Sequence, residues 1–190
     1  KIRCSWCEKD DLYRAYHDHE WGKPVFDDDT IFEFLVLESF QAGLSWYTIL
    51  KKRENFKEAF DDFDYNKIAA YSDEKAEELM QNSGIIRNRL KILATVNNAK
   101  RFMEVQEEFG TFSKYIWSFV GGKPIVNQFS ELKEVPAKTE ISDALAKDLK
   151  KRGFKFLRST VVYAHMQATG MVNDHVMECW VRNQYIMRVC

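Results

Sequence analysis

The apolar residues of this 190-residue chain recur at helical spacing along almost its whole length, and this pattern limits the fold more than any other feature. In residues 29–43, for example, Ile31, Phe34 and Leu35 fall on one face of a helix. The alternation typical of strands is absent apart from a weak pattern at residues 124–129, and the three prolines lie between the helical stretches. The sequence therefore predicts an all-α fold.

Capping residues predict where several of these helices begin and end. Ser45 and Ser72 are candidate N-caps, because a serine hydroxyl accepts a hydrogen bond from a free N–H group of the first turn. Gly84 is a candidate stop signal. The predicted helices cover residues 29–43, 45–56, 72–84, 87–109, 111–122, 141–153 and 158–170. No linker, repeat or low-complexity tract divides them, so we expect one compact domain over residues 1–190.

The composition is ordinary for a soluble globular protein, with 45% hydrophobic and 30% charged residues. There is no run of about 18 apolar residues and no secretory leader at the start. We therefore expect a cytoplasmic protein that does not bind membranes. In an intracellular chain, four cysteines favour metal ligands or free thiols over disulfides. They are Cys4, Cys7, Cys179 and Cys190.

Basic residues gather in blocks, although the net charge of −1 gives no general sign of nucleic-acid binding. The blocks read KKRENFK, RNRLK and KDLKKRGFKFLR. Such blocks suit contacts with phosphates, but any one of them taken alone is more typical of a solvated helix face.

One basic segment, NSGIIRNRLKI, predicts two helices joined by a tight turn at Gly84. A hairpin of this kind presents backbone N–H groups and a helix N-terminus to a phosphate. Arg87, Arg89 and Lys91 would add positive charge at the same place. The second glycine that is usual in such hairpins is missing here.

A possible metal site involves His175 and Cys179, which would share one face if their segment were helical. A closed zinc site takes four ligands and serves structure rather than chemistry. The candidate partners near the N-terminus are Cys4, Cys7, His17 and His19. From the residues alone, buried thiols and imidazoles without a metal, or a C-x-x-C redox pair, remain alternatives.

Seven segments in order resemble the type I bacterial 3-methyladenine DNA glycosylases. They are YHDHEWG (16–22), LESFQAGLSW (37–46), LKKREN (50–55), GIIRNRLKI (84–92), WSFV (117–120), SDALAKDLKKRGFKF (142–156) and MQATGMVNDH (166–175). The resemblance implies a helix-hairpin-helix glycosylase fold, with the hairpin around residues 73–98. It also implies a zinc-bearing lobe that joins residues 1–25 and 160–190.

The resemblance implies one structural zinc and assigns its ligands. They are Cys4, His17, His175 and Cys179. Cys7 and His19 are left outside the site. The tail WVRNQYIMRVC is not covered by the resemblance, and we expect Cys190 to be a free thiol.

The resemblance also implies an activity, the excision of 3-methyladenine from double-stranded alkylated DNA. The damaged base would flip into an aromatic pocket, where Glu38 accepts from its exocyclic amine and takes the catalytic role. Tyr16 and Trp46 would line or stack on the base, and Trp21 would support them. The other aromatic residues assigned to the pocket are Trp6 and Tyr13. The resemblance further places a wedge in the turn at Gly43, with Leu44 filling the gap left in the DNA.

We expect a monomeric enzyme that does not cleave the strand and that releases free 3-methyladenine, working in a bacterial cytoplasm with the nucleoid. One departure from the family is Ala164, which stands where a small hydroxyl residue is expected and is followed by His165. The aspartate that many helix-hairpin-helix glycosylases use is also missing. The alternatives are a zinc-stabilised helical module that binds damaged DNA without catalysis, and a redox protein that uses Cys4 and Cys7.

Overall fold

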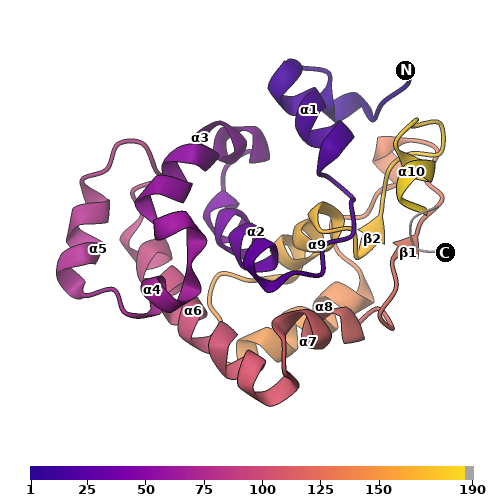
Figure 1. The fold of residues 1–190 in the computed structure, drawn as a ribbon. Helices are drawn as coiled ribbons and strands as arrows, with labels where there is room; N and C mark the ends of the chain where they lie inside the picture. Colours follow the sequence, from indigo (N-terminus) through magenta and orange to yellow (C-terminus); the bar gives the residue numbers. More distant parts are fainter. Residues whose placement is uncertain (187–190) are drawn as a thin grey trace.

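The computed structural model describes residues 1–186, and α-helices make up most of it (Figure 1). The helices are α1 (Asp11–His19), α2 (Asp28–Gln41), α3 (Trp46–Ala59), α4 (Tyr65–Ala69), α5 (Asp73–Met80), α6 (Arg89–Phe109), α7 (Phe112–Ser118), α8 (Glu140–Lys151), α9 (Ser159–Ala168) and α10 (Arg182–Ile186). Short 3-10 helices lie at Ser5–Cys7, Asp61–Phe63 and Leu132–Glu134, and short strands form β1 (Ile125–Val126) and β2 (Val172–Asn173). The predicted helical class is thus confirmed, with a small strand pair added.

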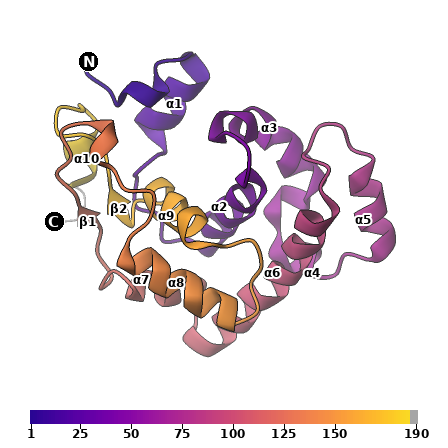
Figure 2. The same cartoon turned by 180° about the vertical axis from the view of Figure 1, so that it is seen from behind.

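Helix α2 lies at the centre of the molecule, with α3 and α6 on one side and α9 on the other (Figures 1 and 2). Its residues are apolar on every face, and the run from Ile31 to Phe40 is buried apart from Glu33. A helix that is apolar all round must be covered on all sides. Any polar group in the last turns of α2 therefore lies deep in the protein.

The N- and C-terminal segments lie side by side, and both views place the N-terminus close to α10 (Figures 1 and 2). The backbone N–H of Trp180 donates to the carbonyl of Ile2 at 3.0 Å. Strands β1 and β2 pair in parallel, so the weak strand pattern predicted near residue 125 is real. Cys190 falls outside the described residues.

Several predicted helix boundaries are confirmed by the side-chain contacts at their ends. Ser45 caps α3 by accepting from the N–H of Thr48, and Ser72 caps α5 in the same way. The predicted stop at Gly84 is wrong, because α5 ends at Met80 and a short connection follows. Within residues 1–186, no helix is both long enough and apolar enough to cross a bilayer.

Candidate active site and metal cluster

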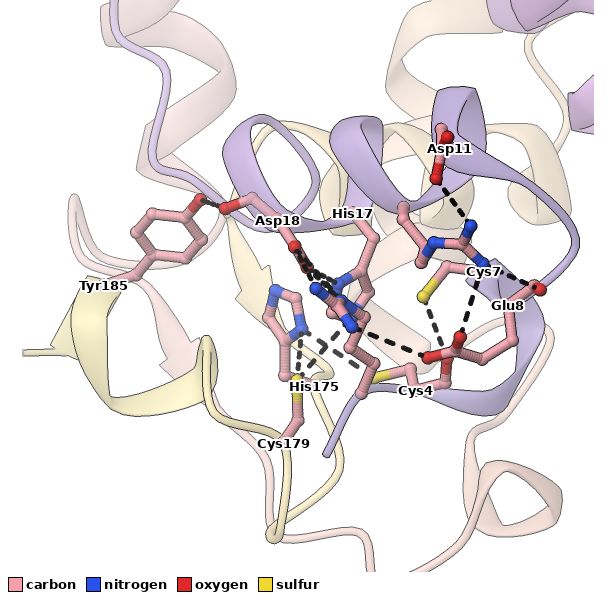
Figure 3. Close-up of polar contacts among 11 residues, drawn as sticks. Cys4, Cys7, Glu8, Asp11, His17, Asp18, His175, Cys179 and Tyr185 are labelled. Atoms are coloured by element: carbon pink, nitrogen blue, oxygen red, sulfur yellow. Dashed lines mark hydrogen bonds and ion pairs between the residues drawn. The ribbon is translucent and has the colours of Figure 1, made fainter. Parts of the chain in front are cut away.

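Two cysteines and two histidines from opposite ends of the chain meet at a single point (Figure 3). Their four ligand atoms all lie within 4.8 Å of one another, and all four residues are buried. The Sγ atom of Cys179 is 3.5 Å from Nε2 of His17 and 3.5 Å from Nδ1 of His175. The Sγ atom of Cys4 is 3.8 Å from the same Nδ1 of His175. These four residues form a cluster that could hold a metal ion.

Three S···N separations in this cluster, 3.5, 3.5 and 3.8 Å, are close to those of a tetrahedral thiolate and imidazole site. With metal–sulfur and metal–nitrogen bonds of about 2.3 and 2.0 Å, a tetrahedral angle places S and N about 3.5 Å apart. The outer ring nitrogens are also occupied, which orients both rings. Nε2 of His175 bonds the carbonyl of Trp21 at 2.9 Å, and Nδ1 of His17 bonds the carboxylate of Asp18 at 2.8 Å.

Asp18 is itself held by Arg3, whose guanidinium donates to both carboxylate oxygens at 2.9–3.1 Å. A hydrogen bond between the two thiols raises the pKa of Cys4 and lowers that of Cys179. Cys179 is therefore the thiol of the pair that gives up its proton more readily, and its Sγ atom faces two imidazole nitrogens.

The structure also corrects the local geometry that the sequence suggested for this cluster. The segment from Asp174 to Cys179 is a loop with a turn, not a helix, so no helical face joins His175 to Cys179. Cys7 lies outside the cluster, since its thiol donates to the carbonyl of Cys4 at 3.1 Å. His19 is exposed and is not part of the cluster.

A cavity of about 210 Å³ opens beside the cluster, and all six predicted base-binding residues line it. They are Trp6, Tyr13, Tyr16, Trp21, Glu38 and Trp46. The ring of Trp6 lies edge-on to Tyr13 and Trp21, with centroids 4.9 and 5.0 Å apart. Tyr16 and Trp46 face each other at 5.6 Å. The cavity is thus walled by aromatic rings from α1, the start of α3 and the N-terminal segment.

Glu38 supplies a carboxylate to this aromatic cavity, although its side chain is only 1% exposed. Burial raises the pKa of Glu38, and its contact with His165 opposes that effect. Burial also raises the pKa of Tyr16 well above its usual value, and the charge of Glu38 adds to the shift. Tyr16 is therefore a neutral phenol at physiological pH, able to donate to a ligand.

The segments predicted to meet DNA lie at two connections between helices. Gly43 has a φ of +81°, and Leu44 at the same turn between α2 and α3 is 40% exposed. In the connection between α5 and α6, Arg87 is exposed and Arg89 pairs with Glu77. Gly84 has no positive φ, and a Cβ at this position would lie 3.1 Å from the side chains of Asn55 and Asn82, a tight contact.

A family model described as methyladenine glycosylase matches residues 6–183. The chain is also 50% identical to DNA-3-methyladenine glycosylase 1 of Escherichia coli (strain K12) over 177 residues, which are 93% of this chain and 95% of that protein. This chain belongs to the methyladenine glycosylase family.

Solved structures agree with this family assignment. A crystal structure of 3-methyladenine DNA glycosylase I, 50% identical, superposes with a TM-score of 0.91 and covers 94% of this chain and 98% of its own. The enzyme of that name from Staphylococcus aureus, studied for its recognition of 3-methyladenine, is 39% identical with a TM-score of 0.92, covering 95% and 96%. The present methyladenine glycosylase therefore has the fold of these proteins over nearly its full length.

The sequence missed several residues that line the cavity of this methyladenine glycosylase. They are Gln41, Leu132, Val135, Gln167, Asp174 and Val176. Asp174 is the most informative, because it is a buried carboxylate held by three donors. Asn127 donates to it at 2.7 Å and Gln167 at 3.0 Å, and the hydroxyl of Tyr163 donates as well. No local pattern marks it, since its partners on α9 and at Asn127 meet it only in the folded protein.

Lys91 corrects the predicted set of DNA-binding residues in this glycosylase. Its ammonium is buried and donates to the carbonyls of Phe40 at 2.9 Å and Ala42 at 2.8 Å. Burial lowers the pKa of Lys91. A cation at the C-terminal end of α2 is favourable, because the free carbonyls there carry partial negative charge. Lys91 therefore joins α6 to the turn at Gly43 and is not free to contact a phosphate.

Proposed function

We propose that this chain excises 3-methyladenine from double-stranded alkylated DNA, as a monofunctional hydrolase of base-excision repair. The observation that carries the proposal is the buried carboxylate of Glu38 at the wall of a cavity rich in aromatic rings. Burying a charged carboxylate is costly, and a cationic base with an exocyclic amine offsets that cost by charge and by hydrogen bonding. The family membership supports the same reading.

The base must leave the DNA stack before it can reach this cavity, at a cost of a few kcal/mol. An N3-methylated adenine pairs poorly, so it leaves more easily than an undamaged base. Leu44, exposed at its turn, is placed to fill the gap in the duplex. Lys91 holds the carbonyls of Phe40 and Ala42 beside that turn, which fixes the position of the wedge.

The chemical step needs little acid catalysis, because the alkylated base already carries a positive charge. The N-glycosidic bond breaks, its electron pair stays on the base, and the base leaves as a neutral molecule. A water oxygen bonds to the sugar carbon and loses a proton to solvent. In the bound state, Glu38 accepts from the amine of the base, Tyr16 and Trp46 cover its faces, and Trp21 supports them.

The developing positive charge on the sugar is stabilised by a negative field. Glu38 and Asp174 are the two carboxylates that line the cavity. Asp174 is fixed by its three donors and so cannot turn away when the charge develops. This fixed negative charge compensates for the missing aspartate of other helix-hairpin-helix glycosylases.

We assign a structural zinc ion to Cys4, His17, His175 and Cys179. The donor set of two thiols and two imidazoles, the burial and the S···N separations all support zinc. Four protein ligands leave no open position, so zinc would hold the N-terminal segment against the C-terminal one. Because the rings of Trp6 and Trp21 pack against the ring of His17, the same ion would keep the aromatic wall in place.

The connection between α5 and α6 is proposed as a helix-hairpin-helix contact for DNA phosphates, through Gly84, Arg87 and Arg89. The double substitution Arg87→Ala and Arg89→Ala should weaken binding to damaged and undamaged duplexes equally, by about tenfold at low salt. The slope of log affinity against log salt should also become shallower by about two, because each neutralised phosphate contributes roughly one. Fluorescence anisotropy with both duplexes measures this.

Lys114→Ala is the control for this double substitution, since it removes one exposed cation from α7, away from the α5–α6 connection. It should leave the affinity and the salt slope unchanged. A loss of affinity confined to damaged duplex would mean that Arg87 and Arg89 read the lesion and do not hold the backbone.

Release of free base from methylated DNA tests the proposed function directly. The protein should release 3-methyladenine, without strand cleavage, from DNA treated with a methylating agent. Chromatography of the soluble fraction detects the base, and gel electrophoresis detects any break. Tight binding to the methylated duplex without base release would instead identify a damage-binding module. The single domain, the monomeric state and the cytoplasmic location stay predictions.

A further inference from the structure

In the part of the chain that the structure describes, the side chain of Glu38 has one polar side-chain partner, His165 of α9, and the pair is buried. The distance from Nδ1 of His165 to Oε2 of Glu38 is 2.8 Å, and both side chains are 1% exposed. Ala164 lines the cavity, whereas His165 does not. The imidazole therefore contacts the carboxylate from behind, on the side away from the cavity. No hydroxyl at position 164 shares this task.

The surroundings of His165 determine which of its nitrogens carries a proton. Within residues 1–186, Nε2 is buried without a hydrogen-bond partner. A carboxylate can only accept, so Nδ1 is the nitrogen that donates to Glu38.

We propose that His165 is a positioning residue that keeps Glu38 ionised and directs its free oxygen at the cavity. This inference rests on the proposed role of Glu38 as the residue that reads the cationic base. In this chain, Ala164 has no hydroxyl to bond the base or the carboxylate. His165, which does not line the cavity, supplies the polar contact to the carboxylate of Glu38 instead. An ionised Glu38 complements a substrate with a fixed positive charge.

Few other titratable groups act on this pair. Tyr16 faces Glu38 from α1, and Asp174, Tyr13 and Cys4 line the same cavity from other segments. Burial raises the pKa of Glu38, and His165 is the group that opposes it. Because protonated Glu38 carries no charge, excision falls as the pH drops through this pKa. Removing the N–H donor of His165 should raise the pKa of Glu38 further. The fall of the excision rate at low pH, called here the acid limb, should then begin at a higher pH.

The test compares two substitutions of His165 by single-turnover excision across pH. His165→Phe keeps a ring of similar size but removes the donor, whereas His165→Asn keeps an N–H group close to the Nδ1 position. We expect His165→Phe to shift the acid limb upward by about one pH unit, so that excision on that limb falls about tenfold. His165→Asn should keep the limb close to that of the wild type.

A background of Glu38→Gln provides the matched control, because it has no carboxyl group left to titrate. There, His165→Phe should not change the shape of the pH profile. His165→Gln replaces His165→Phe if the latter does not fold, since its amide lies beyond the Nδ1 position. Melting temperature and metal content identify any variant that is merely misfolded.

Two results would overturn this inference. One is an unshifted acid limb in folded His165→Phe, and the other is an equal shift in His165→Phe and His165→Asn, which would point to ring packing. Failure of the proposed function looks different: Glu38→Ala would then excise 3-methyladenine at the wild-type rate, whatever the residue at position 165.

Discussion

Glu38→Ala is expected to reduce single-turnover release of 3-methyladenine by about a hundredfold or more, the loss typical when one preorganised electrostatic contact is removed. The variant removes the side-chain carboxylate of α2 that faces the cavity. Its binding to undamaged duplex should stay normal, because Glu38 is buried and cannot touch a stacked strand. Its affinity for free 3-methyladenine should fall together with the rate.

Two further variants separate charge from stacking in the same assay. Glu38→Gln keeps an acceptor but loses the charge, so its rate should lie between those of wild type and Glu38→Ala. Trp46→Ala should cost about 5- to 150-fold, the equivalent of 1–3 kcal/mol of base stacking. Wild-type excision by Glu38→Ala, in protein with a normal metal content, would place the base elsewhere.

Cys179→Ser should release the metal ion and lower the melting temperature at the same time. A structural zinc contributes roughly 10–16 kcal/mol where it alone folds a small domain. This chain has a large core around α2, so we expect a loss on the order of 4 kcal/mol, or about 8–16 °C in a domain of this size. Elemental analysis and differential scanning calorimetry measure the two effects.

Cys7→Ser is the matched control for the metal, because Cys7 is an equally buried thiol a few ångströms from the cluster. Its thiol donates to the carbonyl of Cys4, and a serine hydroxyl can donate in its place. Metal content should therefore stay at the wild-type level. The ligand assignment is wrong if Cys7→Ser loses the metal while Cys4→Ser retains it.

Local signals in the sequence predicted the helices well, because they depend on neighbouring residues. Ser45 and Ser72 cap α3 and α5 through bonds that span three residues. Tertiary contacts overrode local patterns elsewhere. The segment around His175 could have been helical, but Asn173 pairs with Val126 in a strand and the backbone then turns as a loop.

The candidate site was predictable only in part, because the sequence shows where a charged residue stands but not which groups its side chain contacts in the fold. Lys91 looked like its neighbours Arg87 and Arg89, yet its amine bonds the carbonyl of Phe40, 51 positions earlier. Glu38 and the aromatic wall were found through the family resemblance. Asp174 stayed hidden, since its donors Tyr163 and Gln167 of α9 and the more distant Asn127 meet it only in the folded protein.

The four-residue cluster also determines the order in which the protein can be completed during synthesis. Cys4 and His175 are 171 positions apart, so half of the cluster leaves the ribosome long before the other half exists. At roughly 5–20 residues per second, that delay is about 10–35 s. Meanwhile Trp6 and Trp21 have no closed site to pack against, and the nascent enzyme has no finished base pocket. The cluster and the aromatic wall beside it can therefore close only after residues 175–179 have been synthesised.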